Sequence, residues 1–366
     1  MKHGILSIRE SEIEDIESWL GTQLDLVVTT WNEGQWGLDG ITWGDSDKRA
    51  TLERVFGRTD RQLVLHYEFQ GGNLRDYSSA ADGTHDDKHR QLARELIEIG
   101  MEDTIIRPSG EFNMDWSGRY PNDPSNYAEG LARVVREMRS VDGAAFTFTF
   151  SPDGAGLGVA PEAWPVGAPS WPSGADEPTV CPTLYDTWYG YTDGGPTTQA
   201  EREQAWEEVQ LADIGRWEDF AQARNTTVSG TFEWGGMGDG TPFPSASGYD
   251  NPYFIRKMLD YGRDNGWEYQ TYWNNNYHTI YPRSGAGLEE ASDRFRDLVN
   301  ERSGSSAPST GDETTDPSGS DGTYGGYNTP SEGVLNWHIP LNENFTKIET
   351  DVQDLAARID QLENQQ

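Results

Sequence analysis

Two glutamates stand at places where a sequence seldom puts a charge, each at the end of a short apolar run. Glu111 closes the stretch Thr104-Ile-Ile-Arg-Pro-Ser-Gly-Glu, and Glu233 closes Val228-Ser-Gly-Thr-Phe-Glu. Burying a carboxylate without a partner is costly, so each position indicates either a salt bridge, for example to Arg107, or a working group. Two facing carboxyls suit cleavage of a glycosidic bond, in which one donates a proton and its ionised partner attacks.

The residues around these glutamates favour that chemistry. Phe112 and Trp116 would desolvate Glu111 and raise its pKa, as a proton donor requires. The chain has 14 tryptophans, and sugar faces pack on flat indole rings. We expect two or three of the five at strand ends to face a cleft and the others to fill the core. These five are Trp31, Trp116, Trp188, Trp234 and Trp273.

The elements that must position these residues are short β-branched runs alternating with amphipathic stretches. This alternation predicts a (β/α)₈ TIM barrel over residues 1–302, with its chemistry at the C-terminal ends of the strands. A doubly wound open sheet is the alternative, but the glycine fingerprint that often follows its first strand is absent. The predicted strands are Gly4–Ile8, Leu24–Trp31, Leu63–Phe69, Thr104–Arg107, Ala144–Phe150, Thr183–Tyr189, Thr227–Glu233 and Glu268–Trp273. The predicted helices are Ser11–Leu20, Asp45–Phe56, Asp86–Ile99, Asn126–Arg139, Thr198–Ala212, Trp217–Ala223, Asn251–Asn265 and Gly287–Arg302.

The C-terminal part of the chain has a different composition. Residues 303–333 are mostly Ser, Gly, Thr, Pro and Asp, which predicts a disordered, flexible linker. Residues 334–366 then carry a heptad seam typical of a short coiled-coil helix, so we expect a homo-oligomer through this segment. A dimer is favoured, a trimer stays open, and the alternative is one helix docked on the barrel. The seam consists of Phe345, Ile348, Val352, Leu355, Ile359 and Leu362.

Composition limits the partners and the setting. The chain has 62 acidic and 28 basic residues, a net charge of −34, and only five of the basic residues are lysines. This balance is typical of a halophilic protein, with an ordinary acidic protein as the alternative, and it disfavours nucleic acid as a partner. The sequence contains no run of 18 apolar residues, so we expect no segment to insert in a membrane. Although no signal peptide is recognisable, we expect an extracellular or particle-associated protein in high salt, with a cytoplasmic one still open.

No cofactor or metal is expected. Cys181 is the single cysteine, so an intrachain disulfide is impossible. His85 and His89 have helical spacing, but the sequence around them lacks the pattern of a helical zinc site.

Several motifs together resemble glycoside hydrolase family 26, which includes β-mannanases and related endo-glycanases with catalytic glutamates on barrel strands four and seven. The resemblance lies in Asp82-Gly-Thr-His-Asp, Ile106-Arg-Pro-Ser-Gly-Glu-Phe-Asn-Met-Asp-Trp, Thr231-Phe-Glu-Trp-Gly, Asp250-Asn-Pro-Tyr-Phe-Ile and Tyr272-Trp. It implies that Glu111 is the acid/base and Glu233 the nucleophile of a retaining enzyme. The implied substrate is a β-linked polysaccharide, with a mannan-like polymer as the leading expectation.

The same resemblance implies roles for further residues. Asn113 would touch sugar hydroxyls, Arg107 would orient the carboxylates, and Tyr191 would hydrogen-bond the nucleophile. Trp116 and Trp273 would stack on sugar faces. Family members usually have histidine directly before the acid/base glutamate, where this chain has Gly110. That departure puts mannan specificity in question while leaving the two-glutamate mechanism intact.

A second function class stays open at this stage. A degenerate glycosidase barrel could serve as a glycan-binding or structural module, for example in a viral tail fibre or surface appendage. The source implied by composition and tail is a halophilic archaeon or its virus.

Overall fold

The computed structural model describes residues 1–6, 10–30, 35–42, 47–57, 59–188, 196, 198–242, 246–275, 278–281 and 286–303. The chain divides into two units, residues 1–309 and 310–366, and the second lies wholly outside the described residues. The expected linker (from residue 304 onwards) and the heptad seam therefore stay predictions. No helix in the described part of the chain is long and apolar enough to cross a membrane.

The strands of the described residues pair in parallel in one curled sheet, with the order β6-β5-β4-β3-β2-β1-β9-β8-β7. β6 and β7 belong to one stretch of chain, which pairs with β5 at its start and with β8 at its end. A further bridge joins Val180 to Val228. The arrangement is a TIM-barrel-like α/β fold. The strands are β1 (Lys2–Leu6), β2 (Leu26–Thr30), β3 (Gln62–Tyr67), β4 (Ile105–Pro108), β5 (Thr147–Phe150), β6 (Thr179–Val180), β7 (Leu184–Tyr185), β8 (Gly230–Gly235) and β9 (Tyr269–Trp273).

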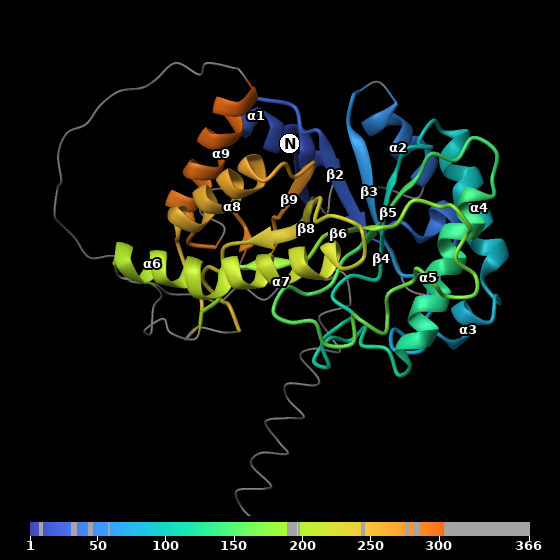
Figure 1. Ribbon diagram of the computed structural model, residues 1–366. Coiled ribbons are helices and arrows are strands. Elements are labelled where there is room, and N and C mark those ends of the chain that lie inside the picture. The colour runs from blue at the N-terminus through green and yellow to red at the C-terminus, as the bar shows by residue number, and fades with distance from the viewer. Residues whose placement is uncertain are drawn as a thin grey trace, which may run out of the picture. The chain divides into compact units, whose positions relative to one another are not determined.

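Helices lie around the outside of the strands (Figure 1). Their starts follow local sequence: Asp123 and Asn251 cap helices that begin with proline, and Thr198 forms a capping box with Glu201. The helical elements are α1 (Glu10–Leu20), η1 (Gly37–Gly40), α2 (Lys48–Phe56), α3 (Ser78–Ala81), α4 (Asp86–Glu98), α5 (Pro124–Arg139), α6 (Gln199–Ala205), η2 (Trp206–Gln210), α7 (Leu211–Gln222), α8 (Pro252–Asp264) and α9 (Glu289–Ser303).

One detail of the predicted helices is wrong. The two helices expected at 198–212 and 217–223 form one continuous helical run, because α6, the π-helical turn η2 and α7 follow one another directly. Gly215 lies inside α7 and does not interrupt it. Between β5 and β6, residues 151–178 are all described and contain no helix, in agreement with the predicted helices, none of which falls in this stretch.

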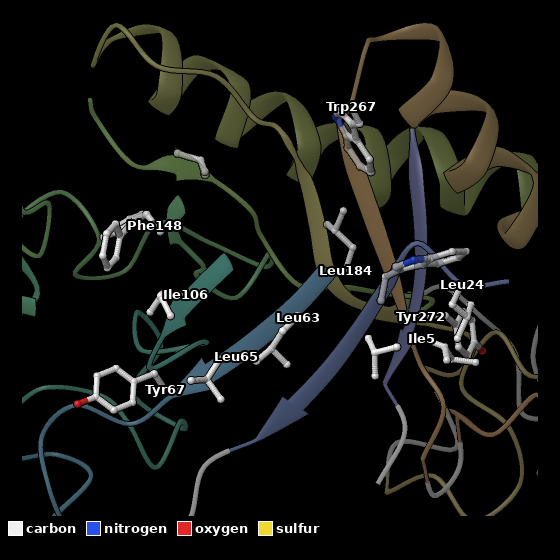
Figure 2. Packing of buried hydrophobic residues seen from close by; sticks show 14 of the residues in the cluster. Ile5, Leu24, Leu63, Leu65, Tyr67, Ile106, Phe148, Leu184, Trp267 and Tyr272 are labelled. Carbon is white, nitrogen blue, oxygen red and sulfur yellow. The ribbon is translucent and has the colours of Figure 1, made fainter. Parts of the chain in front are cut away.

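Alternate strand residues divide the core in two. Leu63, Leu65 and Tyr67 lie on one face of β3 (Figure 2) and join the larger cluster, between the sheet and its helices. Val64 lies on the opposite face and joins a smaller cluster that packs among the strands themselves. Because side chains alternate along a strand, this division tells which positions face the inside of the barrel. The inner cluster consists of Leu6, Leu26, Val28, Val64, Ile105, Cys181, Phe232 and Tyr269.

Candidate active site

The two glutamates singled out in the sequence lie at the same end of the sheet. Glu111 follows β4, and Glu233 lies in the C-terminal half of β8. Because all strands are parallel, their C-terminal ends meet at one edge of the barrel, where this fold carries its active sites. The structure thus brings together two side chains that are 122 positions apart in the sequence.

Glu233 is aimed inward by an irregularity in its strand. The register between β8 and β9 shifts between Thr231 and Trp234. As a result Phe232 packs in the inner cluster, while Trp234, two positions later, packs in the outer one. A bulge of this kind commonly re-aims a side chain beside an active site. Here it leaves Glu233 buried and pointing at groups on β4 and β7.

The partners of Glu233 favour its ionised form. Its Oε2 forms an ion pair with Arg107 Nη1 at 2.7 Å, and Tyr185 Oη donates to its Oε1 at 2.5 Å. Burial alone would raise the pKa of Glu233, but the Arg107 charge and the Tyr185 hydrogen bond outweigh burial and lower it. Glu233 is therefore a carboxylate at neutral pH. The salt bridge to Arg107 that the sequence allowed is therefore present, and it is made by a fully buried arginine.

Glu111 has the opposite environment. Thr183 Oγ1 donates to its Oε1 at 2.9 Å, and no ion pair with Glu111 is found among the described residues. Burial, then the negative charges of Glu233 and Asp153, raise the pKa of Glu111 to about 8. Its backbone has a φ of 59°, and that of Ser109 is 34°. Non-glycine residues in the left-handed region cost on the order of 1–3 kcal/mol each, and such strain gathers at functional sites.

One short strand segment holds both carboxyls. Thr183 and Tyr185 are two positions apart, so their side chains lie on the same face of the chain, and Leu184 between them packs in the outer cluster. Since Thr183 donates to Glu111 and Tyr185 donates to Glu233, one short segment of chain contacts both carboxyls.

The unusual Gly110 is explained by the position of Arg107. A Cβ added at Gly110 would lie 2.5 Å from Nη2 and 2.8 Å from Cζ of Arg107. Any larger residue there would displace the guanidinium that binds Glu233. The Gly110 N–H also donates to Nε2 of His66 at 3.2 Å. Glycine is thus required by the packing of the site, and the departure from the family pattern preserves the Glu233 ion pair.

Asn113 has a different role from the one that the resemblance implies. Its Oδ1 accepts from the Asp153 N–H at 2.6 Å, and its Nδ2 donates to the carbonyls of Asp153 and Gly156. With the side chain fully buried, the amide is committed to the backbone after β5 and is not open to a sugar. Asn113 instead places Asp153, whose own pKa is raised to about 6, mainly by burial.

The five tryptophans at strand ends differ in their exposure. Trp116 is 62% exposed. Trp273 is partly buried against the inner cluster at the end of β9, and Trp188 is half-buried beyond β7. Trp234 is wrongly expected to touch a ligand, because it is fully buried in the outer core and its Nε1 donates to Gln270 Oε1. Trp31 lies outside the described residues.

Sequence reasoning missed several residues of the site. Tyr191, expected to bond the nucleophile, lies outside the described residues, and Tyr185 provides that bond. Glu68, Arg119 and Asp153 also belong to the site's charge balance. Glu68 carries the signal that revealed the two glutamates, a carboxylate at the end of an apolar strand. Within the described residues, no group of three or more acidic, histidine or cysteine side chains could hold a metal ion.

Comparisons with known proteins support the fold. No protein-family model matches the sequence, and no curated protein is similar to it in sequence. Solved structures do match. The glycoside hydrolase family 26 domain of an endo-β-mannanase/endo-β-glucanase from Prevotella bryantii is 11% identical with a TM-score of 0.50, over 82% of this chain and 92% of that domain.

Two further structures match to a similar degree. A broad-specificity endoglucanase of glycoside hydrolase family 5, from an uncultured bacterium, is 10% identical with a TM-score of 0.50, over 81% of this chain and 85% of that one. Cellulose synthase subunit Z from Clostridioides difficile is 12% identical with a TM-score of 0.51, and the match covers 81% of this chain and 99% of that one. At such identities the likeness establishes a shared TIM-barrel-like fold, which alone does not assign an activity.

Proposed function

We propose that this protein is a retaining glycoside hydrolase that cleaves a β-linked polysaccharide, with Glu233 as nucleophile and Glu111 as acid/base. One observation carries the proposal. Two carboxyls, one on buried Glu233 and one on partly buried Glu111, lie at the C-terminal end of one parallel sheet, and their surroundings hold Glu111 protonated and Glu233 ionised. Pairs whose pKa values are pushed apart in this way are the signature of acid/base assignments.

The proposed reaction is a double displacement, as the resemblance to family 26 implies. Glu233, oriented by Arg107 and Tyr185, attacks the anomeric carbon while Glu111 gives its proton to the departing glycosidic oxygen. A covalent glycosyl-enzyme then forms through Glu233. In the second step Glu111, now ionised, removes a proton from water as the water displaces Glu233 from the anomeric carbon, and Glu111 ends protonated again.

The resemblance to family 26 and two of the matched structures support the same reaction class. The matched proteins include an endo-β-mannanase/endo-β-glucanase and an endoglucanase. A mannan-like polymer is therefore the first substrate to test. Trp116 and Trp273 are proposed to stack on sugars, which is supported by the exposure of Trp116, five residues after Glu111, and by the position of Trp273 at the end of β9.

The test measures reducing sugar released from mannan, β-glucan and xylan by the wild type and by Glu233→Gln, in molar and in low salt. We expect one polymer to be cleaved, with a loss of at least about 10⁴-fold in the variant because it lacks a nucleophile. Proton NMR of the first product should show retention of the anomeric configuration. Inversion would contradict the mechanism, and activity that survives Glu233→Gln would contradict the site.

We also propose that residues 334–366 join copies of the chain. Sedimentation of the full chain and of a version ending at residue 302 tests this, with an oligomer expected only for the full chain. The same number of chains per particle in both versions would contradict the proposal.

A further inference from the structure

Arg119 brings a cation to the edge of the catalytic pair. It lies in the loop between β4 and α5, the loop that also carries Glu111 and Trp116. Arg119 donates to Glu68, which also accepts from Ser109, two residues before Glu111, so the guanidinium of Arg119 lies close to the segment that carries the acid/base. Arg107, the other cation near this pair, is fully buried and occupied by Glu233, whereas the side chain of Arg119 is 29% exposed.

A buried carboxylate holds Arg119 in place. Arg119 Nε donates to Glu68 Oε1 at 2.5 Å. Glu68 follows β3 on the inward face, in register with Val64 of the inner cluster. Its Oε2 accepts from Ser109 Oγ at 2.9 Å and from Gln70 Nε2 at 3.0 Å. A carboxylate that is only 5% exposed and fixed by three neighbours is costly unless it is needed to position a partner.

The backbone of Arg119 is also tied down. Its N–H donates to Ser117 Oγ at 3.1 Å, and its carbonyl accepts from Tyr77 Oη at 3.2 Å. Together with the bond to Glu68, these contacts order the side chain before any ligand arrives. A preordered group loses little conformational entropy on binding, which is what a recognition residue requires.

The remaining donors of Arg119 suit an anion. A guanidinium has five N–H donors in a planar fork that matches a carboxylate, and Glu68 is bonded to only one of its nitrogens. A neutral sugar hydroxyl needs no fixed cation for recognition. The chain's net charge of −34 repels acidic polymers at low salt, so an acidic substrate requires a local positive group in the cleft.

We propose that Arg119, held by Glu68, binds a carboxylate of the substrate, so that the polymer cleaved at this site carries uronic acid units close to the scissile bond. This inference rests on the proposed glycosidase function and names its substrate class. The contact persists in molar salt because it is a direct hydrogen-bonded pair, while longer-range repulsion is screened within about 3 Å.

The test compares one uronate-containing β-glycan with its carboxyl-reduced form, which has the same linkages and only neutral sugars. kcat/KM is measured on both polymers in molar salt for the wild type, Arg119→Gln and Arg119→Lys. We expect the wild type to prefer the acidic polymer by about 10- to 100-fold, the range of one charge-assisted contact. Arg119→Gln should lose this preference, because its kcat/KM should fall further on the acidic polymer than on the reduced one, and Arg119→Lys should keep part of the preference.

Arg75→Gln is the matched control. Arg75 lies in the neighbouring loop, is exposed, and its Nε donates to the Tyr120 carbonyl, so it is a nearby cation without the Glu68 anchor. This variant should retain the wild-type preference. Thermal melts of all variants check that the fold is unchanged.

Either of two kinetic results would overturn the inference. A wild type that favours the reduced polymer contradicts it directly. An equal loss on both polymers in Arg119→Gln would mean that Arg119 acts only on the catalytic carboxyls. If the wild type cleaves neither polymer, calorimetry with a uronate oligosaccharide decides separately: binding at least about tenfold weaker in Arg119→Gln sustains the subsite, and equal affinity overturns it.

Discussion

Glu111 and Glu233 are identical side chains at the same edge of the sheet, yet their surroundings differ in almost every respect. Glu233 comes from a bulged strand and is bound by a guanidinium and a phenol. Glu111 comes from a strained turn and is bound by a single hydroxyl. Burial is common to both, so the difference in their pKa directions comes from the partners and not from depth.

The comparison teaches that the two halves of the site are coupled. The negative charge that Arg107 and Tyr185 stabilise on Glu233 is also one of the causes that keep Glu111 protonated. Disturbing one side should therefore change the titration of the other. The four predictions below alter this asymmetry, beginning with the largest expected effect.

Removing the acid itself should have the largest effect. Glu111→Gln keeps the shape but cannot give a proton, so kcat on the polysaccharide should fall by about 10²- to 10⁴-fold. An aryl glycoside with a good leaving group needs no proton donor, so its glycosylation step should lose much less. Steady-state and burst kinetics on both substrates provide the measurement. Equal losses in that step would mean that Glu111 is not the acid.

Gly110→Ala should damage the Glu233 side through Arg107. The added Cβ would lie 2.5 Å from Nη2 of Arg107, so the guanidinium must move and the pKa of Glu233 rises. A nucleophile works only above its pKa, so the acidic limb of the kcat/KM profile should shift to higher pH. We expect kcat to fall by about 10- to 100-fold, as for a small misplacement of catalytic groups.

Gly118→Ala is the control for that change. It lies in the same loop, and an added Cβ there meets nothing within 4 Å. Its pH profile should match that of the wild type. A Gly110→Ala profile that also matches the wild type would remove the proposed role of Arg107.

Tyr185→Phe and Thr183→Val form a matched pair, because each removes one hydroxyl from one carboxyl. Hydrogen bonds to charged groups are worth more than those to neutral ones. We therefore expect kcat to fall about tenfold for Tyr185→Phe and about threefold for Thr183→Val. Only Tyr185→Phe should move the acidic limb upward. A larger loss for Thr183→Val would reverse the proposed charge states.

Asp153→Asn should have the smallest effect on rate and a clear effect on pH. Asp153 raises the pKa of Glu111, and the acid works only below that pKa, so activity is lost as pH rises through it. Removing the charge should move the alkaline limb to lower pH. Because the pKa of Asp153 is about 6, its charge is present at that limb. An alkaline limb that stays in place would show that Asp153 does not act on Glu111.

Much of this site could be predicted from local patterns. The strand ends at Glu111 and Glu233 were found because a carboxylate in an apolar run is conspicuous, and the TIM-barrel-like fold followed from alternating elements. Glu68 carries the same signal and was overlooked. The helix starts at Asp123 and Asn251 also follow from capping residues and the prolines after them.

Other features depend on contacts between distant segments. No local pattern distinguishes Trp234, which is buried in the outer core, from Trp116, which is exposed, because the bulge in β8 decides which way Trp234 points. The resemblance implies that Asn113 binds a sugar, whereas its amide is hydrogen-bonded to the backbone of the loop after β5.

The sequence by itself determined which groups are available: two carboxyls at strand ends, aromatic neighbours, and alternating elements that predict a parallel sheet. Local periodicity suffices for this because side-chain alternation and helix capping act over a few residues. Only the tertiary structure decided which carboxyl keeps its proton. That choice depends on Arg107, Tyr185 and Thr183, whose charge and hydrogen bonds reach Glu111 and Glu233 only once the strands stand side by side.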